Sequence, residues 1–496
     1  MTSAAGFPRI SKQELFGRFV RGQAARLSVV TPNLRLAAAL ARDFDSLQFA
    51  GGLAAWETAD ILPLPAFIER LYDDALYSEL AAGLPALLTP AQEQAVWEGI
   101  VRSSEAGKSL LSVPSAAALA REAWQLSHAW RLTGRLKAYP ANDDARAYAD
   151  WAWRYEGATT RDRQCDRAGL ADIVAPQLGH AALRRPAALV AYGFDMLTPQ
   201  QREFLRAIAA AGTELLESGP DERGATVFRV AFNSAREEIR AAARWARSRL
   251  AADPRARIGI VVPDLAQTRN ALRRVFAQVM EPGHALPGGE AGPLPFNISL
   301  GQPLSSYPLV AAAMLVLDIA RGEVEFSDAS RLLRSPFLGG AEKELAQRAG
   351  LDAELRRVCG ARTGLERLRR AIARLAEPGH GAGACPILAH RLAGLSRTAK
   401  EQLHGAKRPG EWGRVFSALL GAVGFPGERT LDSAEYQTLK KFHEIIAGFA
   451  ALERVAGRMR PDEACTRLAR IAADTLFQPE APEVPIQVLG VLESAG

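Results

Sequence analysis

Cysteine and long apolar runs are both scarce in this sequence. The four cysteines never lie closer than 26 residues apart, which excludes a CxxC metal or redox pair and a dense disulfide framework. No window reaches the roughly 18 apolar residues that a membrane span needs. The first 27 residues carry arginines and Glu14 in place of a long apolar core. We therefore expect a cytoplasmic protein without a membrane partner.

Lysine is scarce as well, with eight lysines against 53 arginines. A nuclease of the PD-(D/E)xK class needs a carboxylate two residues before its lysine, so that the metal ion and the lysine meet the same phosphate. That position is occupied by Ile10, Ala106, Arg135, Ala341, Thr398, Gly405, Thr438 and Leu439. The sequence thus lacks this nuclease motif. Genomic base composition explains the arginine excess better than selection for phosphate contacts, and the net charge of +6 suits nucleic acid without requiring it.

A phosphate-binding loop of the form GxxxxGK[ST] is also missing. Such a loop needs glycine amides around the phosphates and a lysine that reaches the terminal ones. The one Gly-Lys-Ser, at 107–109, has Arg102 where the first glycine belongs. The strand that would hold Mg²⁺ ends on a single carboxylate, Asp195, in place of an Asp-Glu pair. We therefore expect neither ATP hydrolysis nor a cofactor.

Metal ligands and catalytic triads are equally hard to assemble. The nearest approach to a metal site is His380, Cys385 and His390, spread across a glycine-rich stretch. A zinc site usually takes a fourth ligand and more tightly spaced pairs, and the sequence order indicates no Ser-His-Asp set. We predict no metal site and no catalytic residue in this chain.

Two sets of alternating strand and helix signals are present. Each signal is a short β-prone run that ends in a turn and leads into an amphipathic helix, which is typical of a parallel sheet covered by helices. The expected strands are 27–31, 61–65, 187–195 and 213–217 in the first set, and 227–231, 258–262, 296–300 and 484–491 in the second. The expected helices between them include 34–44, 66–80, 235–250 and 265–279.

Long helix-compatible stretches interrupt both sets. The first begins at Thr89, a predicted N-cap with proline at the first helical position, and the second runs from Leu309 to Thr475. Five tryptophans lie in the first stretch, and their spacing within apolar helices favours core packing over base-stacking platforms. They are Trp97, Trp124, Trp130, Trp151 and Trp153. The pattern predicts an α/β protein with two helical insertions.

The last predicted strand ends only five residues before Gly496. A buried parallel strand without its following helix is an unusual end for a natural protein. We therefore expect this sequence to be part of a longer chain.

Several stretches, in the right order, resemble the AddB/RecB branch of the superfamily I helicases and its inactivated relatives. The turn Thr31-Pro32-Asn33 after the first strand resembles the motif with which those enzymes touch single-stranded DNA. Gly193-Phe194-Asp195, followed by Leu197-Thr198-Pro199-Gln200-Gln201, is similar to the signature that replaces the ATPase carboxylates in AddB-like subunits. Further similar stretches are 61–71, 234–239, 258–265, 305–309, 332–337 and 488–496. The chain departs from active members because it has no glycine-rich ATP loop before the first matching strand.

The resemblance implies an α/β fold with two RecA-like parallel-sheet lobes of the P-loop NTPase type, each with a large all-helical insertion. The first lobe would be split by its insertion, and the second would end early. The expected boundaries are 1–85 and 181–222 for the first lobe, 86–180 for its insertion, 223–308 and 481–496 for the second lobe, and 309–480 for the second insertion.

The resemblance also implies a function, namely a DNA-binding scaffold in DNA repair or recombination. The family normally carries a PD-(D/E)XK nuclease domain after such an inactivated helicase-like module, so the full-length protein would be an exonuclease through that domain. The implied partners are single-stranded DNA or duplex ends and a motor helicase subunit. The main alternative is a protein-interaction scaffold of a repair complex that has no DNA affinity of its own.

Thr31, Asn33 and Arg35 are the candidate contacts to the DNA backbone. Hydroxyls, amides and arginines at strand ends and helix N-termini are suited to phosphate binding. An ordinary helix cap is an equally good interpretation of these residues. Asp264 and Glu493 are interpreted as caps or loop carboxylates.

Overall fold

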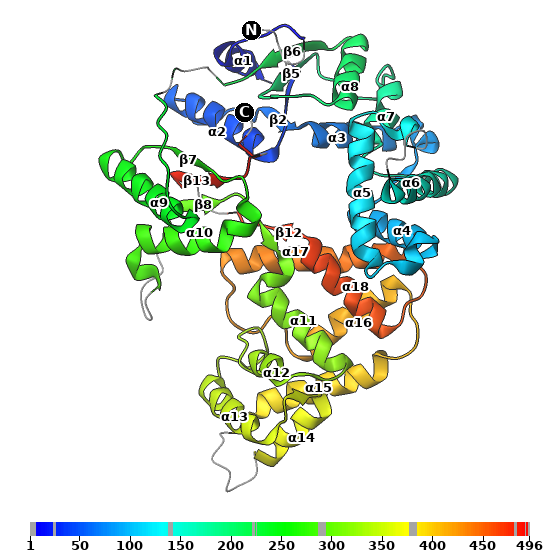
Figure 1. Ribbon diagram of the computed structural model, residues 1–496, viewed down its shortest axis with the longest axis vertical. Helices are drawn as coiled ribbons and strands as arrows, with labels where there is room; N and C mark the ends of the chain where they lie inside the picture. The colour runs from blue at the N-terminus through cyan, green and yellow to red at the C-terminus, as the bar shows by residue number, and fades with distance from the viewer. Residues whose placement is uncertain are drawn as a thin grey trace. The chain divides into compact units, whose positions relative to one another are not determined.

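The computed structural model describes residues 6–22, 26–136, 142–220, 224, 226–285, 294–375, 384–480, 484–491 and 493–494. The chain has a mixed α/β structure and divides into two compact units (Figure 1). Unit 1 comprises Met1–Leu88, Trp97–Ser299 and Val484–Gly496, and unit 2 comprises Thr89–Val96 and Leu300–Glu483. The six-part division expected from the sequence is finer than this one and stays a prediction.

One parallel sheet in unit 1 contains the strands β1 (Leu27–Thr31), β2 (Asp60–Pro63), β5 (Ala188–Tyr192) and β6 (Glu214–Ser218). Their order is β2-β1-β5-β6, and every neighbouring pair is parallel. All five residues of β1 and all five of β5 are buried, as is typical of parallel strands covered on both faces. The four strands predicted for the first set are thereby confirmed, with ends that shift by a few residues.

Helices cover both faces of this sheet. Successive residues of a strand point to opposite faces, so neighbouring residues of β1 contact different helices. Val29 shares a core with residues of α1 (Lys12–Phe19) and α2 (Leu34–Ala50). Its neighbour Val30 shares the other core with residues of α3 (Leu64–Leu76), α7 (Leu170–Val174) and α8 (Pro199–Ala210). The sheet is therefore the middle layer of three.

A helical layer lies between α3 and α7 in the sequence, and it contains α4 (Pro90–Ser103), α5 (Val113–Ala129) and α6 (Asp143–Arg161). The pair β3 (Ala86–Leu87) and β4 (Gln164–Cys165) brackets it in the sequence. The Gly-Lys-Ser at 107–109 lies in the 3-10 helix Ala106–Ser109 between α4 and α5, where Lys108 pairs with Glu105 at 2.6 Å. It follows a helix, whereas the lysine of a phosphate loop would follow a strand.

The tryptophans of this layer divide into two groups. Trp97 is fully buried and stacks on Tyr155 with ring centroids 4.2 Å apart. Trp124 and Trp151 are buried too, and their indole N–H groups donate to Asp166 and Ser104. Core packing is thus confirmed for these three. It was the wrong interpretation for Trp130 and Trp153, which are exposed.

A second parallel sheet in unit 1 contains β7 (Ile258–Val261), β8 (Phe296–Ile298) and β13 (Ile486–Leu489). The order is β7-β13-β8, so the strand that comes last in the sequence lies in the middle. The helices α9 (Ala235–Ala252) and α10 (Leu265–Met280) pack against each other beside this sheet (Figure 1). These strands and helices agree with the sequence predictions.

One predicted strand of the second set, 227–231, was wrong. Residues 226–233 have no strand pairing, and Val227, Phe228 and Val230 are largely exposed. An apolar β-prone run becomes a strand only when a neighbouring strand accepts its backbone hydrogen bonds. Among the described residues none does so here.

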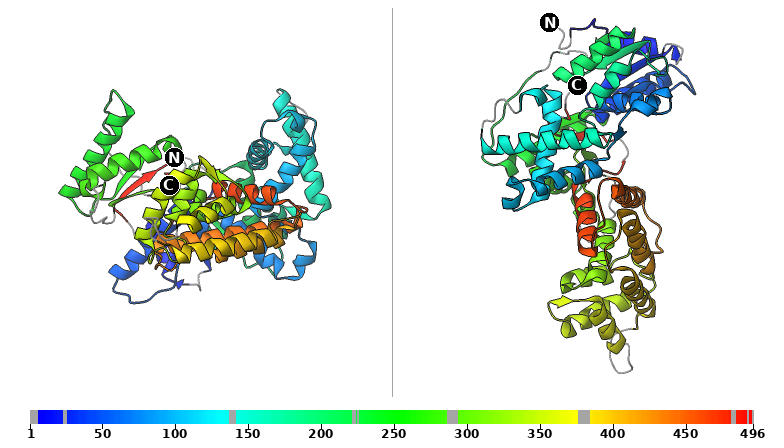
Figure 2. Two further views of the ribbon diagram at one scale, coloured as in Figure 1. Left: turned by 90° about the horizontal axis from the view of Figure 1, so that it is seen from below. Right: turned by 90° about the vertical axis from the view of Figure 1, so that its right-hand side faces the viewer.

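Unit 2 is mostly helical, and its helices share one large core (Figure 1, Figure 2). Trp412, Phe416, Phe442 and Phe449 are its largest fully buried aromatic side chains. No described helix of either unit has the length and apolar character that crossing a bilayer requires. The elements of unit 2 are β9 (Gln302–Pro303), α11 (Pro308–Arg321), β10 (Val324–Glu325), α12 (Phe326–Leu333), α13 (Leu345–Val358), β11 (Arg362–Thr363), α14 (Leu365–Leu375), α15 (Pro386–Gln402), α16 (Pro409–Ala422), α17 (Ser433–Ala451), α18 (Pro461–Asp474) and β12 (Leu476–Phe477).

Candidate functional site

The predicted DNA contacts lie where β1 ends and α2 begins. The sheet order reverses between β1 and β5: the chain leaves β1 through α2 toward β2, and it leaves β5 through α8 toward β6 (Figure 1). These two helices lie on opposite faces of the sheet. Ligand crevices of open α/β sheets form outside the carboxyl ends of the strands at such a reversal. Thr31, Asn33 and Arg35 are therefore at the position where a ligand of this sheet is expected.

Thr31 and Asn33 both support the turn into α2. The Thr31 side chain is fully buried, and its hydroxyl donates to the carbonyl oxygen of Asn33 at 2.8 Å. Asn33 is the N-cap of α2, because its Oδ1 accepts from the backbone N–H of Leu36 at 2.9 Å. The amide nitrogen of Asn33 is buried and has no hydrogen-bond partner among the described residues. Capping is thus observed, and contact with DNA stays a prediction.

Arg35 connects α2 to the second sheet. Its Nη1 donates to Oε1 of Gln487, on β13, at 2.8 Å, and the side chain is half-buried. Burial lowers the pKa of the guanidinium, and the carboxylate of Glu493 acts in the opposite direction. The group stays charged at neutral pH, since arginine does not deprotonate in proteins. Arg35 thereby links the carboxyl edge of the first sheet to an interior position of β13, since Gln487 is the second residue of that strand.

Glu493 behaves as the loop carboxylate that the sequence indicated. Its Oε2 accepts from the backbone N–H of Gly490 at 3.2 Å and from the hydroxyl of Ser299. These contacts hold the turn that follows β13. Asp264 precedes α10 but makes no side-chain cap hydrogen bond.

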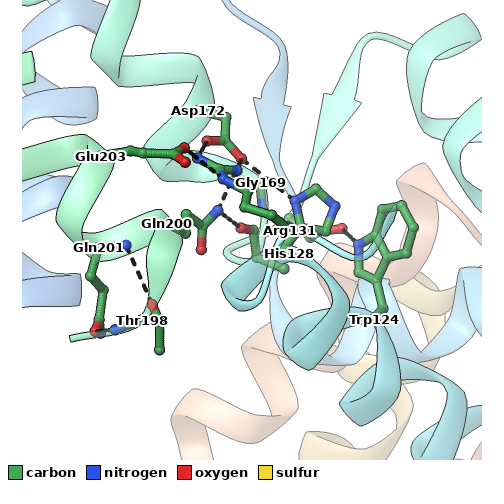
Figure 3. Close-up of polar contacts among 11 residues, drawn as sticks. Trp124, His128, Arg131, Gly169, Asp172, Thr198, Gln200, Gln201 and Glu203 are labelled. Carbon is green, nitrogen blue, oxygen red and sulfur yellow. Dashed lines mark hydrogen bonds and ion pairs between the residues drawn. The ribbon is translucent and has the colours of Figure 1, made fainter. Parts of the chain in front are cut away.

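The segment from Gly193 to Gln201 forms the other side of the sheet reversal. Gly193 has a φ of +71°, a left-handed conformation that favours glycine, and the side chain of Asp195 is exposed. Thr198 and Gln201 then form a capping box at the start of α8, which confirms the predicted helix start (Figure 3). The signature noted at 193–201 in the sequence thus forms the turn at Gly193 and the cap of α8.

Gln200 joins this cap to an ion network (Figure 3). Its Nε2 donates to the Ala168 carbonyl at 2.7 Å and to Oδ2 of Asp172 at 2.9 Å. Arg131 reaches the same carboxylate, with Nη2 at 2.7 Å from Oδ1 of Asp172, and its Nε donates to Glu203 at 2.7 Å. Three segments of unit 1, the end of α5, α7 and α8, are held together here.

Arg131 makes these contacts from a strained backbone position. Its φ is +58°, and it stands directly after α5, where the N–H groups of Arg131 and Leu132 donate to the carbonyls of His128 and Ser127. This is a Schellman motif, in which glycine is the usual residue at the left-handed position. A side chain there costs roughly 1–2 kcal/mol. The ion pairs with Asp172 and Glu203 explain why an arginine is tolerated.

The network sets the ionisation of Asp172. Burial favours its neutral form, but hydrogen bonds from His128, Arg131 and Gln200 outweigh burial and hold the pKa of Asp172 well below its ordinary value. Burial of Arg131 is likewise outweighed by its hydrogen bond to Asp172, and the pKa of Arg131 is raised. Asp172 is therefore a carboxylate throughout the neutral range, and it acts as a structural anion.

We expect Asp172→Asn to lower the free energy of unfolding of unit 1 by about 1–2 kcal/mol at pH 7, because Arg131 and Gln200 lose a charged acceptor. The folded pKa of Asp172 lies below its unfolded value, so this contribution is complete above about pH 4 and declines as the pH falls further. Urea unfolding of both proteins from pH 7 to pH 3 measures the difference. Asp195→Asn, at an exposed carboxylate, is the control. A difference that grows below pH 4 would contradict this account.

A cavity of about 590 Å³ opens at the opposite, amino edge of the same sheet. Its lining includes Ser28, Asp60 and Arg70, and Arg70 binds both oxygens of Asp60, at 2.7 and 3.0 Å. The hydroxyl of Ser28 donates to the same carboxylate. The charges of Asp60 and Arg70 therefore satisfy each other within this cavity.

The described residues contain no group of three or more His, Cys, Asp or Glu placed to hold a metal ion. Of the three residues considered above, His380 lies outside the described residues, and Cys385 directly precedes α15, which contains His390. Burial raises the pKa of the Cys165 thiol to about 12 and those of Cys385 and Cys465 to about 11. These three thiols are poor nucleophiles at neutral pH.

Two partners in this part of the molecule were not predicted from the sequence. Gln487 gave a weak signal, as an amide within an otherwise apolar strand. The pairing of Arg131 with Asp172 gave none, because the two residues are 41 positions apart and lie on separate helical segments.

Comparisons with known proteins add no relationship to this geometry. No protein-family model matches the chain, and no curated protein matches it. The functional conclusion therefore depends on the residues and contacts described above.

Proposed function

We propose that this chain is a DNA-binding scaffold of a cytoplasmic DNA repair or recombination complex. It would be an inactivated helicase-like module of the AddB/RecB type, with two RecA-like lobes built on the two parallel sheets. The proposal assigns no ATPase or nuclease chemistry to these residues. Its partners are single-stranded DNA or duplex ends, together with a motor helicase subunit.

The observation that carries the proposal is the composition of the sheet edge at the strand-order reversal. In nucleotide-binding α/β proteins this edge carries a glycine-rich loop that cradles phosphates. Here β1 ends at Thr31, and Pro32, Asn33 and then Arg35 in the first turn of α2 follow it. Arginine and amide side chains at a helix N-terminus contact the phosphates of a nucleic acid backbone. The same edge therefore favours a nucleic acid strand over a nucleoside triphosphate.

The second support is the link between the two sheets. Arg35 lies within 2.8 Å of Gln487 on β13, so a phosphate bound by Arg35 would lie near residues of both sheets. A DNA strand that follows the carboxyl edge of the first sheet would meet Arg35 at the start of α2. In this arrangement the chain holds DNA without moving it.

The test is binding of the chain to a fluorescent single-stranded oligonucleotide over a salt series. We expect micromolar or tighter binding at low salt and a steep loss with added salt, because bound phosphates release counterions. Arg35→Ala should reduce the salt slope by about 0.7, the contribution of one phosphate on a single strand. Fluorescence anisotropy measures both quantities.

Gln487→Ala is the matched control, because it removes the Arg35 to Gln487 hydrogen bond but keeps the guanidinium. We expect it to bind DNA with an unchanged salt slope. Equal losses in both variants would show that Arg35 acts through the sheet contact. Salt-insensitive or absent binding by the unmodified chain would favour the protein-interaction scaffold, for which the exposed apolar residues Val227, Phe228 and Val230 offer a surface.

A further inference from the structure

The net positive charge of the chain is concentrated in one short segment. Residues 226–285 contain eleven arginines and five acidic residues, a net charge of +6 that equals that of the whole chain. The rest of the chain carries fifty basic and fifty acidic residues. Base composition alone accounts for many arginines, but it does not account for this separation of charge. The segment includes α9, β7 and α10, preceded by residues 226–233, which form neither helix nor strand.

Four of these arginines form a stripe along α9: Arg236, Arg240, Arg244 and Arg247. Residues three and four positions apart are neighbours on one side of a helix, so the spacing aligns all four. Each of the four is exposed. Like charges at this spacing destabilise a helix by about 0.2–0.5 kcal/mol per pair. Repulsion within the arginine stripe therefore destabilises the free helix, and an anionic ligand would reduce that repulsion.

Several arginines on other helices pair with a carboxylate of their own helix. Arg102, Arg154 and Arg356 each pair with a carboxylate four residues earlier, at 3.9, 2.9 and 3.0 Å. Among the described residues, no carboxylate lies within 4 Å of any member of the arginine stripe, and Arg247 donates to the backbone carbonyl of Val279 at 3.0 Å. This holds even though the first turn of α9 contains two carboxylates, Glu237 and Glu238.

The stripe borders a groove between α9 and α10. The groove has a volume of about 450 Å³ and is lined by Arg244, Arg247, Ser248, Ala251, Gln278 and Val279. Its polar lining consists of two guanidinium groups, a hydroxyl and an amide, all of which can donate to phosphate oxygens. No acidic side chain lines it. The groove thus matches the backbone of a nucleic acid in charge and in hydrogen-bond donors.

Exposed aromatic rings accompany these charges. Phe228 and Phe232 lie among residues 226–233, which lead into α9. Trp245 lies on α9, with the guanidinium of Arg249 over its ring at 5.7 Å. Aromatic rings beside a basic groove bind single-stranded nucleic acid because the bases are free to stack on them. The bases of a duplex are already stacked and do not offer this contact.

We infer that the arginine stripe and the α9 to α10 groove bind the phosphate backbone of single-stranded DNA. This inference rests on the proposed function and gives that function a second contact surface, separate from the edge at Arg35. The stripe supplies the charge, and the exposed rings distinguish a single strand from a duplex.

The test compares two triple variants of the chain that remove the same charge. The stripe variant is Arg240→Gln, Arg244→Gln and Arg247→Gln. The control variant is Arg206→Gln, Arg374→Gln and Arg454→Gln, at three exposed arginines on other elements that have no acidic partner among the described residues. Anisotropy of a fluorescent oligo(dT) over a salt series should show a slope lower by about 2 for the stripe variant, three contacts at about 0.7 each. Its affinity at low salt should fall at least about tenfold, and circular dichroism should confirm that both variants are folded.

The outcomes distinguish failure of the arginine-stripe inference from failure of the proposed function. If both variants lose equal affinity, general charge and not the stripe binds DNA, so the inference is overturned while the proposed function stands. If the unmodified chain does not bind, the proposed function and the inference both fail. A duplex of the same length that binds as tightly as oligo(dT) would overturn the assignment to single strands.

Discussion

Replacing Glu344 by glutamine should lower the free energy of unfolding of unit 2 by about 3–5 kcal/mol, the range for breaking a buried ion pair. Glu344 and Arg348 are 5% and 2% exposed in their side chains and pair at 3.2 Å. The carboxylate also accepts from the backbone N–H groups of Ile387 and Leu388, at 2.6 and 3.0 Å. An amide would place N–H groups against these donors, and it would leave Arg348 without its counterion.

The same substitution should loosen the start of α15 in particular. Ile387 and Leu388 lie in its first turn, whose N–H groups have no partners within the helix. Hydrogen exchange measured on peptides from 384–402, together with urea unfolding, tests both effects. Glu342→Gln changes an exposed carboxylate two residues away and should stay within about 0.5 kcal/mol of the unmodified protein. A similarly small effect of Glu344→Gln would mean that the pair is not desolvated.

Truncating Trp97 to alanine should destabilise unit 1 by about 3–5 kcal/mol, because it empties the space of a fully buried indole. The substitution removes the stack on Tyr155, with centroids at 4.2 Å, and the edge contact with Trp124 at 6.1 Å. Such aromatic pairs contribute about 0.5–1.5 kcal/mol beyond the area that they bury. Urea unfolding followed by tryptophan fluorescence measures the loss.

Trp97→Phe separates packing from hydrogen bonding at this position. The indole N–H of Trp97 is buried and has no hydrogen-bond partner among the described residues, so its removal leaves no acceptor unsatisfied. We expect a loss of about 1–2 kcal/mol from the smaller ring. Trp130→Ala, at an exposed indole, should cost less than about 1 kcal/mol. If Trp130→Ala were as harmful as Trp97→Ala, burial would not explain the difference between the two tryptophans.

Much of the layered α/β pattern could be predicted from local sequence. The runs that became β1 and β5 are short, apolar and bounded by turn residues, and burial on both faces leaves no polar alternation to confuse the signal. Thr198-Pro199 predicted the start of α8 because a capping box is a local device. The run at 227–231 has the same local signal, but a strand also needs a partner, which local sequence does not contain.

The candidate site was less predictable, since its contacts join distant parts of the chain. Asn33 could be interpreted as a cap from its neighbours alone. The partner of Arg35 could not, because Gln487 is 452 residues away. The charge of residues 226–285 can be read from the sequence. Its significance depends on the exposure of the arginine stripe and on the groove beside it, which only the folded structure provides.

The central position of β13 has a consequence for how the chain folds. β13 pairs with β7 at Ile486 and Ile258, 228 residues apart in the sequence. Neither β7 nor β8 can complete its hydrogen bonds until β13 has been synthesised and inserted between them. Closing so long a loop is entropically costly, and contacts of high sequence separation form slowly. We expect this sheet to assemble later than helix pairs that are adjacent in the sequence, such as α9 and α10. Until then its two outer strands present open edges that favour aggregation of the nascent chain.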